Sequence, residues 1–123
     1  MIMPVRGIRG ATTIAFDRQD EVLAATSELL EQMQRINSFV PEEIAAVLFT
    51  VTIDIHSVFP ARAARNMGWE SVPLMCFNEI ETEGSLPLCI RILILWNTDL
   101  NQNQIKHVYL HGAKILRPDL IVE

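Results

Sequence analysis

Arg91 has the clearest chemical potential in this sequence, because it stands inside the most apolar stretch of the chain. That stretch, residues 89–96, runs Cys-Ile-Arg-Ile-Leu-Ile-Leu-Trp. A guanidinium stays charged inside a protein, and removing it from water is costly unless an anion compensates it. We therefore expect Arg91 to pair either with a carboxylate of the protein, such as Glu79, or with an anionic ligand.

The other basic residues also favour a small anionic ligand. The chain has eight arginines and two lysines, and arginine presents a planar fork of donors that suits carboxylates. Arg62 and Arg65 lie three residues apart, so on a helix they share one face. That face is either a solvated charged surface or a cationic rim over a cleft. The net charge of −5 argues against nucleic acid or an anionic membrane as a partner.

Covalent and metal-dependent chemistry has little support. The sequence contains no His-Glu-x-x-His motif, no Cys-x-x-Cys pair and no nucleophile elbow, so we expect no metal site. Cys76 lies in an apolar stretch, where a packed thiol is commoner than a nucleophile. His56 has no evident carboxylate to orient it, and the other two histidines are expected to be structural or exposed. A reaction that needs only binding, conformational restraint and charge stabilisation would fit these residues.

The hydrophobic pattern predicts the elements that must position these side chains. Apolar residues form one helical stripe over 20–36, and Pro60 suits the first position of a short helix over 60–67. Strands are predicted over 5–13, 46–52, 72–77, 89–96 and 107–111. The chain is thus expected to be a single α+β domain, residues 1–123, with a mixed, mostly five-stranded sheet packed against two helices.

Several positions refine this expectation. The strand that carries Arg91 should be buried on both faces, because it is apolar throughout and rich in β-branched residues. Pro73 indicates that its strand lies at an edge of the sheet or begins there. Gly7 and Gly10 indicate a close backbone approach or a bulge in the first strand.

The composition also carries information about assembly and location. Hydrophobic residues make up 50% of the chain, which is high for a small domain and suggests apolar surface buried against other copies of the protein. No apolar run approaches the ~20 residues of a membrane-spanning helix. The N-terminus lacks a signal-peptide pattern, and the two cysteines are expected to be reduced thiols. We therefore expect a cytoplasmic protein with no membrane partner.

Six blocks of sequence together resemble a known family. In order, they are Arg-Gly-Ile-Arg-Gly-Ala-Thr-Thr (6–13), Phe-Pro-Ala-Arg-Ala-Ala-Arg (59–65), Val-Pro-Leu-Met-Cys-Phe-Asn-Glu (72–79), Cys-Ile-Arg (89–91), His-Val-Tyr-Leu (107–110) and Leu-Arg-Pro-Asp-Leu (116–120). This order closely resembles the monofunctional, trimeric class of chorismate mutase typified by Gram-positive bacteria. The resemblance covers essentially the whole chain.

The resemblance implies a fold, an assembly and a reaction. Members of the class are homotrimers in which the sheets pack at the centre, the helices lie outside, and three active sites form at subunit interfaces. The implied substrate is chorismate, and the implied reaction is its Claisen rearrangement to prephenate on the route to phenylalanine and tyrosine. The resemblance implies that no metal or organic cofactor and no covalent intermediate takes part.

The resemblance also implies roles for residues of the predicted polar site. Arg91 matches the arginine that faces the breaking ether oxygen, where negative charge builds in the transition state. Arg9 and Tyr109 match residues that hold the side-chain carboxylate of the substrate. Glu79 and Cys76 match residues that meet the ring hydroxyl.

The remaining matches concern the walls and the mouth of the site. Phe59 and Leu116 match apolar walls that help to confine the compact substrate conformer. Arg65 matches an arginine at the rim of the cleft, and Arg117 a basic residue near its mouth. Arg62 is expected at the rim as well, although better-known members have lysine at that position, so its hydrogen-bond geometry can differ.

Two further points follow from the resemblance. Met75 is expected beside the substrate, at a position where a threonine can occur, and it removes a side-chain hydroxyl from this region. The alternative function is that of a non-catalytic, trimeric small-molecule-binding or regulatory protein of the same fold. Such a protein should have lost at least one residue of the polar set, yet the set is complete in this sequence: Arg9, Glu79, Arg91 and Tyr109.

Overall fold

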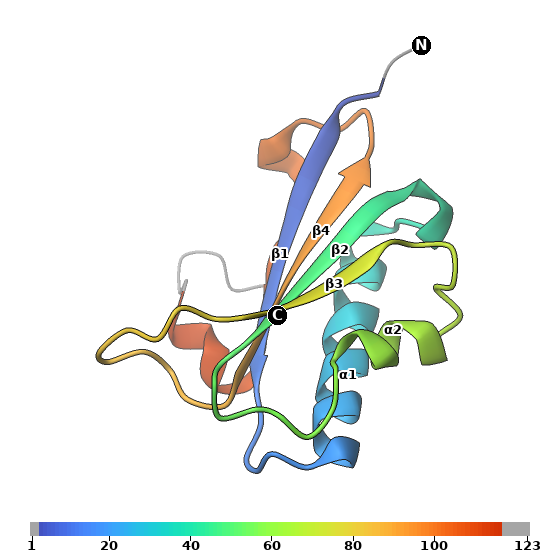
Figure 1. The fold of residues 1–123 in the computed structure, drawn as a ribbon. Helices are drawn as coiled ribbons and strands as arrows, with labels where there is room; N and C mark the ends of the chain where they lie inside the picture. The colour runs from blue at the N-terminus through green and yellow to red at the C-terminus, as the bar shows by residue number, and fades with distance from the viewer. Residues whose placement is uncertain (1–2, 117–123) are drawn as a thin grey trace.

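A five-stranded sheet forms the centre of the protein, with the strands in the order β3-β2-β4-β1-β5 (Figure 1). The computed structural model describes residues 3–116. The strands are β1 (Val5–Thr13), β2 (Ile44–Val51), β3 (Leu74–Asn78), β4 (Cys89–Asn97) and β5 (Val108–Tyr109). β4 runs antiparallel to both β1 and β2, whereas β2 pairs in parallel with β3 and β1 with β5. The predicted mixed sheet is therefore confirmed.

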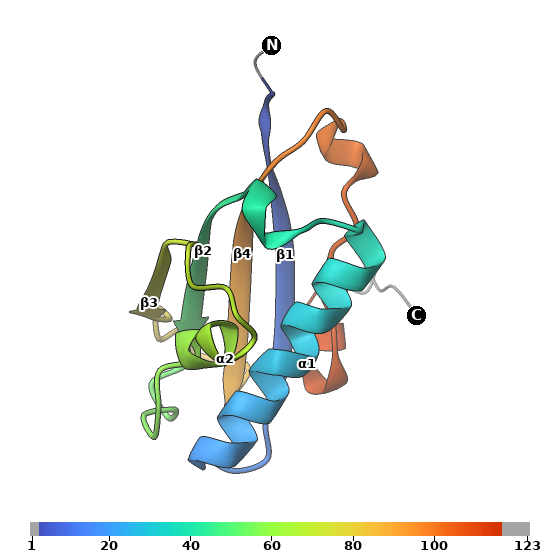
Figure 2. The same ribbon diagram turned by 90° about the vertical axis from the view of Figure 1, so that its right-hand side faces the viewer.

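Two α-helices cover the same face of this sheet (Figure 2). They are α1 (Gln19–Asn37) and α2 (Ala61–Asn66). The predicted apolar stripe of α1 is confirmed, because its inward-facing residues are buried: Val22, Thr26, Leu29, Leu30 and Met33. Leu29, Leu30 and Met33 pack into one core with residues from three strands of the sheet: Ile8, Val47, Ile92 and Ile94. Val22 packs in a second cluster with Val51, Ile55 and Ile90. No helix among residues 3–116 combines the length and apolar character needed to cross a membrane.

The burial of β4 alternates, which corrects the prediction that both of its faces are buried. Ile90, Ile92 and Ile94 face the helices and are buried, whereas Arg91 and Leu93 are only partly covered. The reason is that neither α-helix lies over the second face of the sheet (Figure 2). We call this second face the open face; the 3₁₀ turn η3 (His111–Ile115) packs against β1 beside it.

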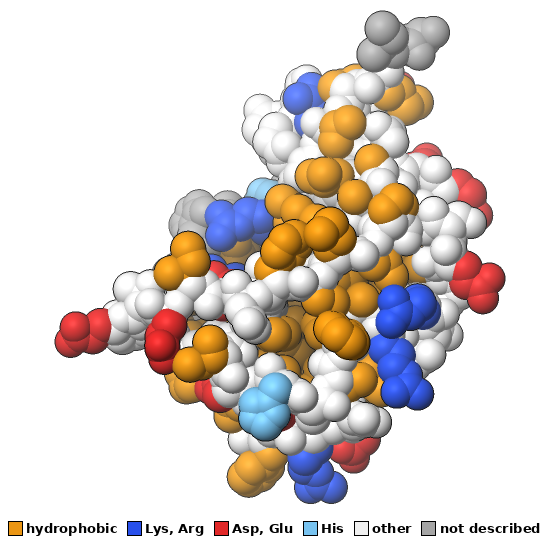
Figure 3. Space-filling model, in the orientation of Figure 1, with side chains coloured by type: hydrophobic (Ala, Val, Ile, Leu, Met, Phe, Trp, Pro, Cys, Tyr) orange, Lys and Arg blue, Asp and Glu red, His pale blue; other side chains and the backbone are white. Residues whose placement is uncertain are grey.

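The open face is largely apolar. The strand register places Met75, Leu48, Leu93 and Arg9 in one row across β3, β2, β4 and β1. Figure 3 shows hydrophobic side chains gathered over the strands, with a separate group of basic side chains over α2. An apolar surface of this kind on a small protein is typical of a contact with another protein chain.

Two ends of the sheet show where the local sequence decides the structure. β3 begins immediately after Pro73 and lies at an edge, as predicted. The last strand is shorter than predicted: β5 ends at Tyr109, and His111 adopts a left-handed conformation with φ of 53°. That residue turns the chain into η3, so the expected strand over 107–111 is wrong beyond Tyr109.

Gly10 lies where helix α1 packs tightly on β1, which confirms the predicted close approach. A Cβ atom at this position would be 2.5 Å from Sδ of Met33 and 3.2 Å from Cδ1 of Leu29. The pairing of β1 with β4 runs without interruption from Val5 to Thr13, so no bulge is formed there. The absence of a side chain thus allows the helix to pack directly on the strand.

We expect Gly10→Ala to lower the free energy of unfolding by about 1–3 kcal/mol, because the added methyl group overpacks the contact with Met33. Met33→Ala alone should cost about 2–5 kcal/mol through the cavity that it leaves. The double variant should lose clearly less unfolding free energy than the two single variants added together, because the space left by Met33 accommodates the added methyl group. Denaturant unfolding at one fixed protein concentration measures all three. Additive effects would contradict the packing explanation.

Candidate active site

Arg91 and Glu79 form an ion pair on the open face of the sheet. Nε of Arg91 lies 3.5 Å from Oε1 of Glu79, and the two side chains are 35% and 25% exposed. Glu79 follows β3, and its backbone N–H donates to the carbonyl of Val51. The hydroxyl of Thr50 also donates to Oε1 of Glu79. The predicted structural partner of Arg91 is therefore present, and it is itself fixed by a neighbouring strand.

The ion pair lines a hollow of about 310 Å³ together with Arg9 and Tyr109. Ala11 of β1 pairs with Tyr109 on one side and Arg91 on the other. This small residue leaves room between the two larger side chains. The structure thus brings together four predicted site residues that come from four separate parts of the chain.

Two polar groups in this hollow have unused hydrogen-bonding capacity. Nε of Arg91 and the hydroxyl of Tyr109 are buried, and neither has a hydrogen-bond partner among the described residues. Tyr109 is only 2% exposed. A buried polar group without a partner costs about 1–3 kcal/mol. A ligand with anionic or hydrogen-bonding oxygens would satisfy both groups, which makes this hollow a candidate anion site.

A second hollow, of about 590 Å³, contains two other predicted basic residues. Arg62 and Arg65 of α2 line it, together with Phe59 and Cys76. Phe59 is 69% exposed, so its ring forms an open wall. Phe77 lines both hollows. Because Cys76 and Phe77 are neighbours on β3, their side chains point to opposite faces of the sheet. Phe59 and Cys76 do not line the first hollow, and Arg91 does not line the second. Within one chain the predicted site is therefore divided into two halves, which adjoin at Phe77.

Two further predicted site residues lie outside these two hollows, and a third is not among the residues that the structure describes. Met75 lies on the open face opposite Leu48 and is exposed. Leu116 follows η3 and packs against a small cluster that includes Tyr109, so it lies close to the first hollow. Arg117 is outside the described residues.

Sequence reasoning missed two residues and misjudged a third. Thr50 and Phe77 line the first hollow although neither was predicted. The register of β2 with β4 places Thr50 directly beside Arg91, and alternation along β2 could have identified it. His56 was expected to lack a carboxylate partner, which is wrong: its Nδ1 lies 3.4 Å from Oδ2 of Asp17. Asp17 and His56 are far apart in the sequence, so no local pattern indicates this contact.

The cysteine environments argue against a thiolate nucleophile. Burial raises the pKa of the Cys76 thiol, and the backbone of Ala61 and the charge of Arg65 only partly oppose this effect. Burial likewise raises the pKa of Cys89, although the nearby Arg91 lowers it in part. Both thiols are therefore neutral at pH 7. Within residues 3–116 no three His, Cys, Asp or Glu side chains are grouped closely enough to hold a metal ion.

Fold and site together define a small α+β protein with two arginines lining a hollow on an uncovered sheet face. Over residues 5–120 the chain matches the family model described as chorismate mutase type I. It is 45% identical over 119 residues to chorismate mutase AroH of Bacillus subtilis (strain 168), covering 96% of this chain and 94% of the relative. It is 52% identical over 117 residues to chorismate mutase AroH of Thermus thermophilus, covering 94% and 96%.

A solved structure agrees with these relatives. Chorismate mutase from Clostridium thermocellum superposes with a TM-score of 0.87 at 50% identity, covering 89% of this chain and 97% of that structure. The chain belongs to the chorismate mutase type I family, as its sequence blocks indicated.

We expect alkylation of Cys76 to be slow at neutral pH, because its raised pKa leaves a smaller thiolate fraction than in an ordinary thiol. The rate should increase with pH, with a midpoint above that of the same cysteine in urea-unfolded protein. Iodoacetamide labelling followed by peptide mass spectrometry measures Cys76 and Cys89 separately. Faster labelling of Cys76 in the folded than in the unfolded chain at pH 7 would contradict a neutral thiol.

Proposed function

We propose that this protein catalyses the Claisen rearrangement of chorismate to prephenate, as a homotrimer with active sites at its subunit interfaces. The observation that carries this proposal is the hollow that joins Arg91 with Arg9 and Tyr109, in which neither Nε of Arg91 nor the Tyr109 hydroxyl has a hydrogen-bond partner among the described residues. Membership of the chorismate mutase type I family supports the choice of substrate. The reaction belongs to the biosynthesis of phenylalanine and tyrosine, which fits a cytoplasmic enzyme.

Charge stabilisation by Arg91 is the central step of the proposed mechanism. In the rearrangement one carbon–oxygen bond breaks and one carbon–carbon bond forms within the same molecule, so no proton, electron or group is exchanged with a second reactant. Negative charge builds on the ether oxygen as its bond to carbon breaks. A donor fixed in advance at that oxygen contributes about 3–4 kcal/mol of transition-state stabilisation. Glu79 holds the guanidinium in place through the ion pair at Nε.

The remaining residues of the first hollow bind and orient the substrate. Arg9 and the hydroxyl of Tyr109 hold the side-chain carboxylate, and Glu79 accepts the ring hydroxyl. Because Tyr109 is buried, its hydroxyl offers a hydrogen bond in a site with little competing water. The reacting ends of the substrate must meet in one compact conformer, and fixed contacts at both ends favour that conformer.

The second hollow supplies the other half of the site from a neighbouring chain. In one chain Phe59, Arg65 and Cys76 do not line the hollow that contains Arg91. A second chain seated on the apolar open face would cover Leu93 and Met75 and would bring its own second hollow to Arg91. This arrangement assigns Phe59 and Cys76 to one subunit and Arg91 to the next.

The alternative, a non-catalytic binding or regulatory protein of the same fold, is less well supported. All four residues of the polar set are retained and line one hollow. Purified protein added to chorismate should therefore cause a loss of its ultraviolet absorbance well above the uncatalysed rate. No turnover above that rate would rule out the enzyme and favour the alternative.

We expect Arg91→Ala to reduce kcat/KM by about 10³-fold or more, because it removes the donor to the ether oxygen. Arg91→Lys should also have a strongly reduced kcat/KM, since an ammonium group cannot reproduce the fork of donors. Arg35→Ala, in the exposed last turn of α1, is the matched control and should behave as the unaltered protein. Circular dichroism reports whether each variant is folded. Activity of Arg91→Ala within tenfold of the unaltered enzyme would exclude the charge-stabilisation mechanism.

We expect two inactive variants to complement each other if active sites form between subunits. Arg91→Ala removes a residue of the first hollow, and Arg65→Ala removes one of the second. In trimers co-refolded from equal amounts, about one quarter of the interfaces combine two intact halves, so activity should rise to about that fraction. Light scattering confirms the trimer, and each variant refolded alone is the control. Absence of recovery in mixed trimers would show that each chain builds its own site.

A further inference from the structure

The loop between β2 and α2 carries the apolar wall of the second hollow but has no regular secondary structure of its own. Residues 52–60 form turns and bends, and Phe59 projects from the end of this loop just before α2 begins. Loops are held less firmly than strands unless side chains anchor their backbone groups. The position of Phe59 therefore depends on whatever fixes the preceding residues.

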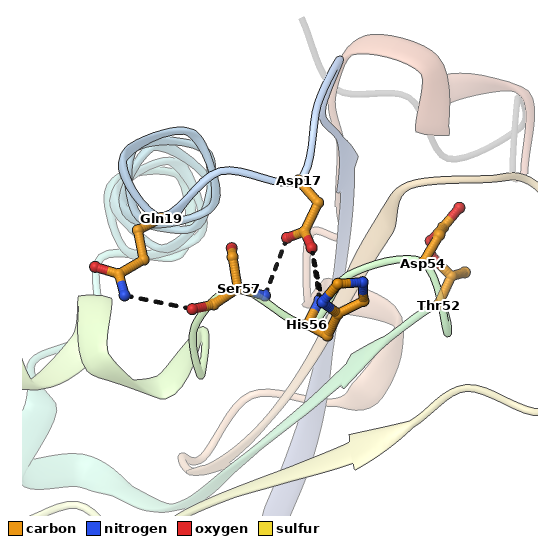
Figure 4. Close-up of polar contacts among 6 residues, drawn as sticks. All are labelled: Asp17, Gln19, Thr52, Asp54, His56 and Ser57. Carbon is orange, nitrogen blue, oxygen red and sulfur yellow. Dashed lines mark hydrogen bonds and ion pairs between the residues drawn. The ribbon is translucent and has the colours of Figure 1, made fainter.

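The carboxylate of Asp17 provides this anchor (Figure 4). Its Oδ2 accepts a hydrogen bond from the backbone N–H of His56 at 2.9 Å, and its Oδ1 accepts one from the N–H of Ser57 at 3.2 Å. Nδ1 of His56 lies 3.4 Å from the same Oδ2 atom. Nearby, the amide of Gln19 donates to the carbonyl of Ser57 at 3.4 Å. One carboxylate thus binds two consecutive backbone groups of the loop.

Asp17 is itself held on a rigid support. It lies two residues before the first residue of α1, whose buried stripe packs on the sheet. Its side chain is only 14% exposed. Burial raises the pKa of this carboxyl group, but hydrogen bonds from His56 and Ser57 outweigh that effect, so the pKa is lowered overall. The group is therefore ionised at neutral pH, and charged acceptors form the stronger hydrogen bonds.

A second carboxylate anchors the other end of the loop to a different partner. Asp54 accepts hydrogen bonds from the hydroxyl of Thr52 and from the backbone N–H of Leu88, immediately before β4. This contact holds the first residues of the loop to the sheet, whereas Asp17 holds the residues nearest to Phe59. The loop is therefore fixed between the sheet and α1, and its functional end depends on Asp17.

We propose that Asp17 is a positioning residue for catalysis, which sets the wall formed by Phe59 and the start of α2 through its two backbone hydrogen bonds. This inference rests on the proposed function. Asp17 does not touch the reacting atoms. It acts by holding the second half of the site ready for the substrate, so its loss weakens substrate confinement while Arg91 and Glu79 stay in place.

The test compares Asp17→Ala with Asp20→Ala, an exposed acidic residue at the start of the same helix. We expect Asp17→Ala to raise KM by about tenfold with a smaller change in kcat, because it removes binding that substrate and transition state share. Asp17→Asn keeps one acceptor oxygen and should give an intermediate KM. Asp20→Ala should leave both constants unchanged.

Hydrogen exchange separates positioning from a general loss of stability. In Asp17→Ala the amides of residues 55–59 should exchange faster, while those of β4 should exchange as in the unaltered protein. Unchanged exchange in the loop, or faster exchange there with an unchanged KM, would overturn the inference. If Asp17→Ala does not fold, Asp17→Asn carries the same test. Inactivity of the unaltered protein would instead refute the proposed function, and the exchange data would still report whether Asp17 anchors the loop.

Discussion

One charged group in apolar surroundings imposes the main constraint on this structure. The guanidinium of Arg91 lies on the central strand of the sheet, two-thirds covered, and it requires an anion close by. Glu79 supplies that anion, and Thr50 fixes Glu79 by a hydrogen bond. The pairing of β2 with both β3 and β4 is what brings these three residues together. A one-residue slip of either strand would turn the side chains to the other face and separate them.

The two faces of the sheet have different roles. The inner face packs against α1 and α2 and provides the core of the subunit. The open face carries the charged hollow within an apolar surface that neither α-helix covers. This division explains why so small a chain is so rich in hydrophobic residues. Its own helices bury one apolar layer, and the proposed trimer would bury the second.

The sequence predicts well those features that depend on local patterns, and less well those that depend on distant contacts. The stripe of α1 and the edge position after Pro73 follow from periodicity and from the chemistry of proline. The alternating burial of β4 could not be predicted, because its isoleucines and leucines suit a covering helix and a covering subunit equally well. The contact of Asp17 with His56 joins two loops that are far apart in sequence, and no periodic pattern predicts it.

The charges of the two hollows give an independent reason for combining them. Arg9, Arg91 and Glu79 line the first hollow, which leaves one net positive charge there. A substrate with two carboxylates is not neutralised by that charge alone, and the protein as a whole is acidic, at −5. The second hollow adds Arg62 and Arg65, and none of its lining residues in the described part of the chain is a carboxylate. In the proposed trimer, joining the hollows across an interface would create a local cationic site able to hold a dianion despite the negative charge of the rest of the protein.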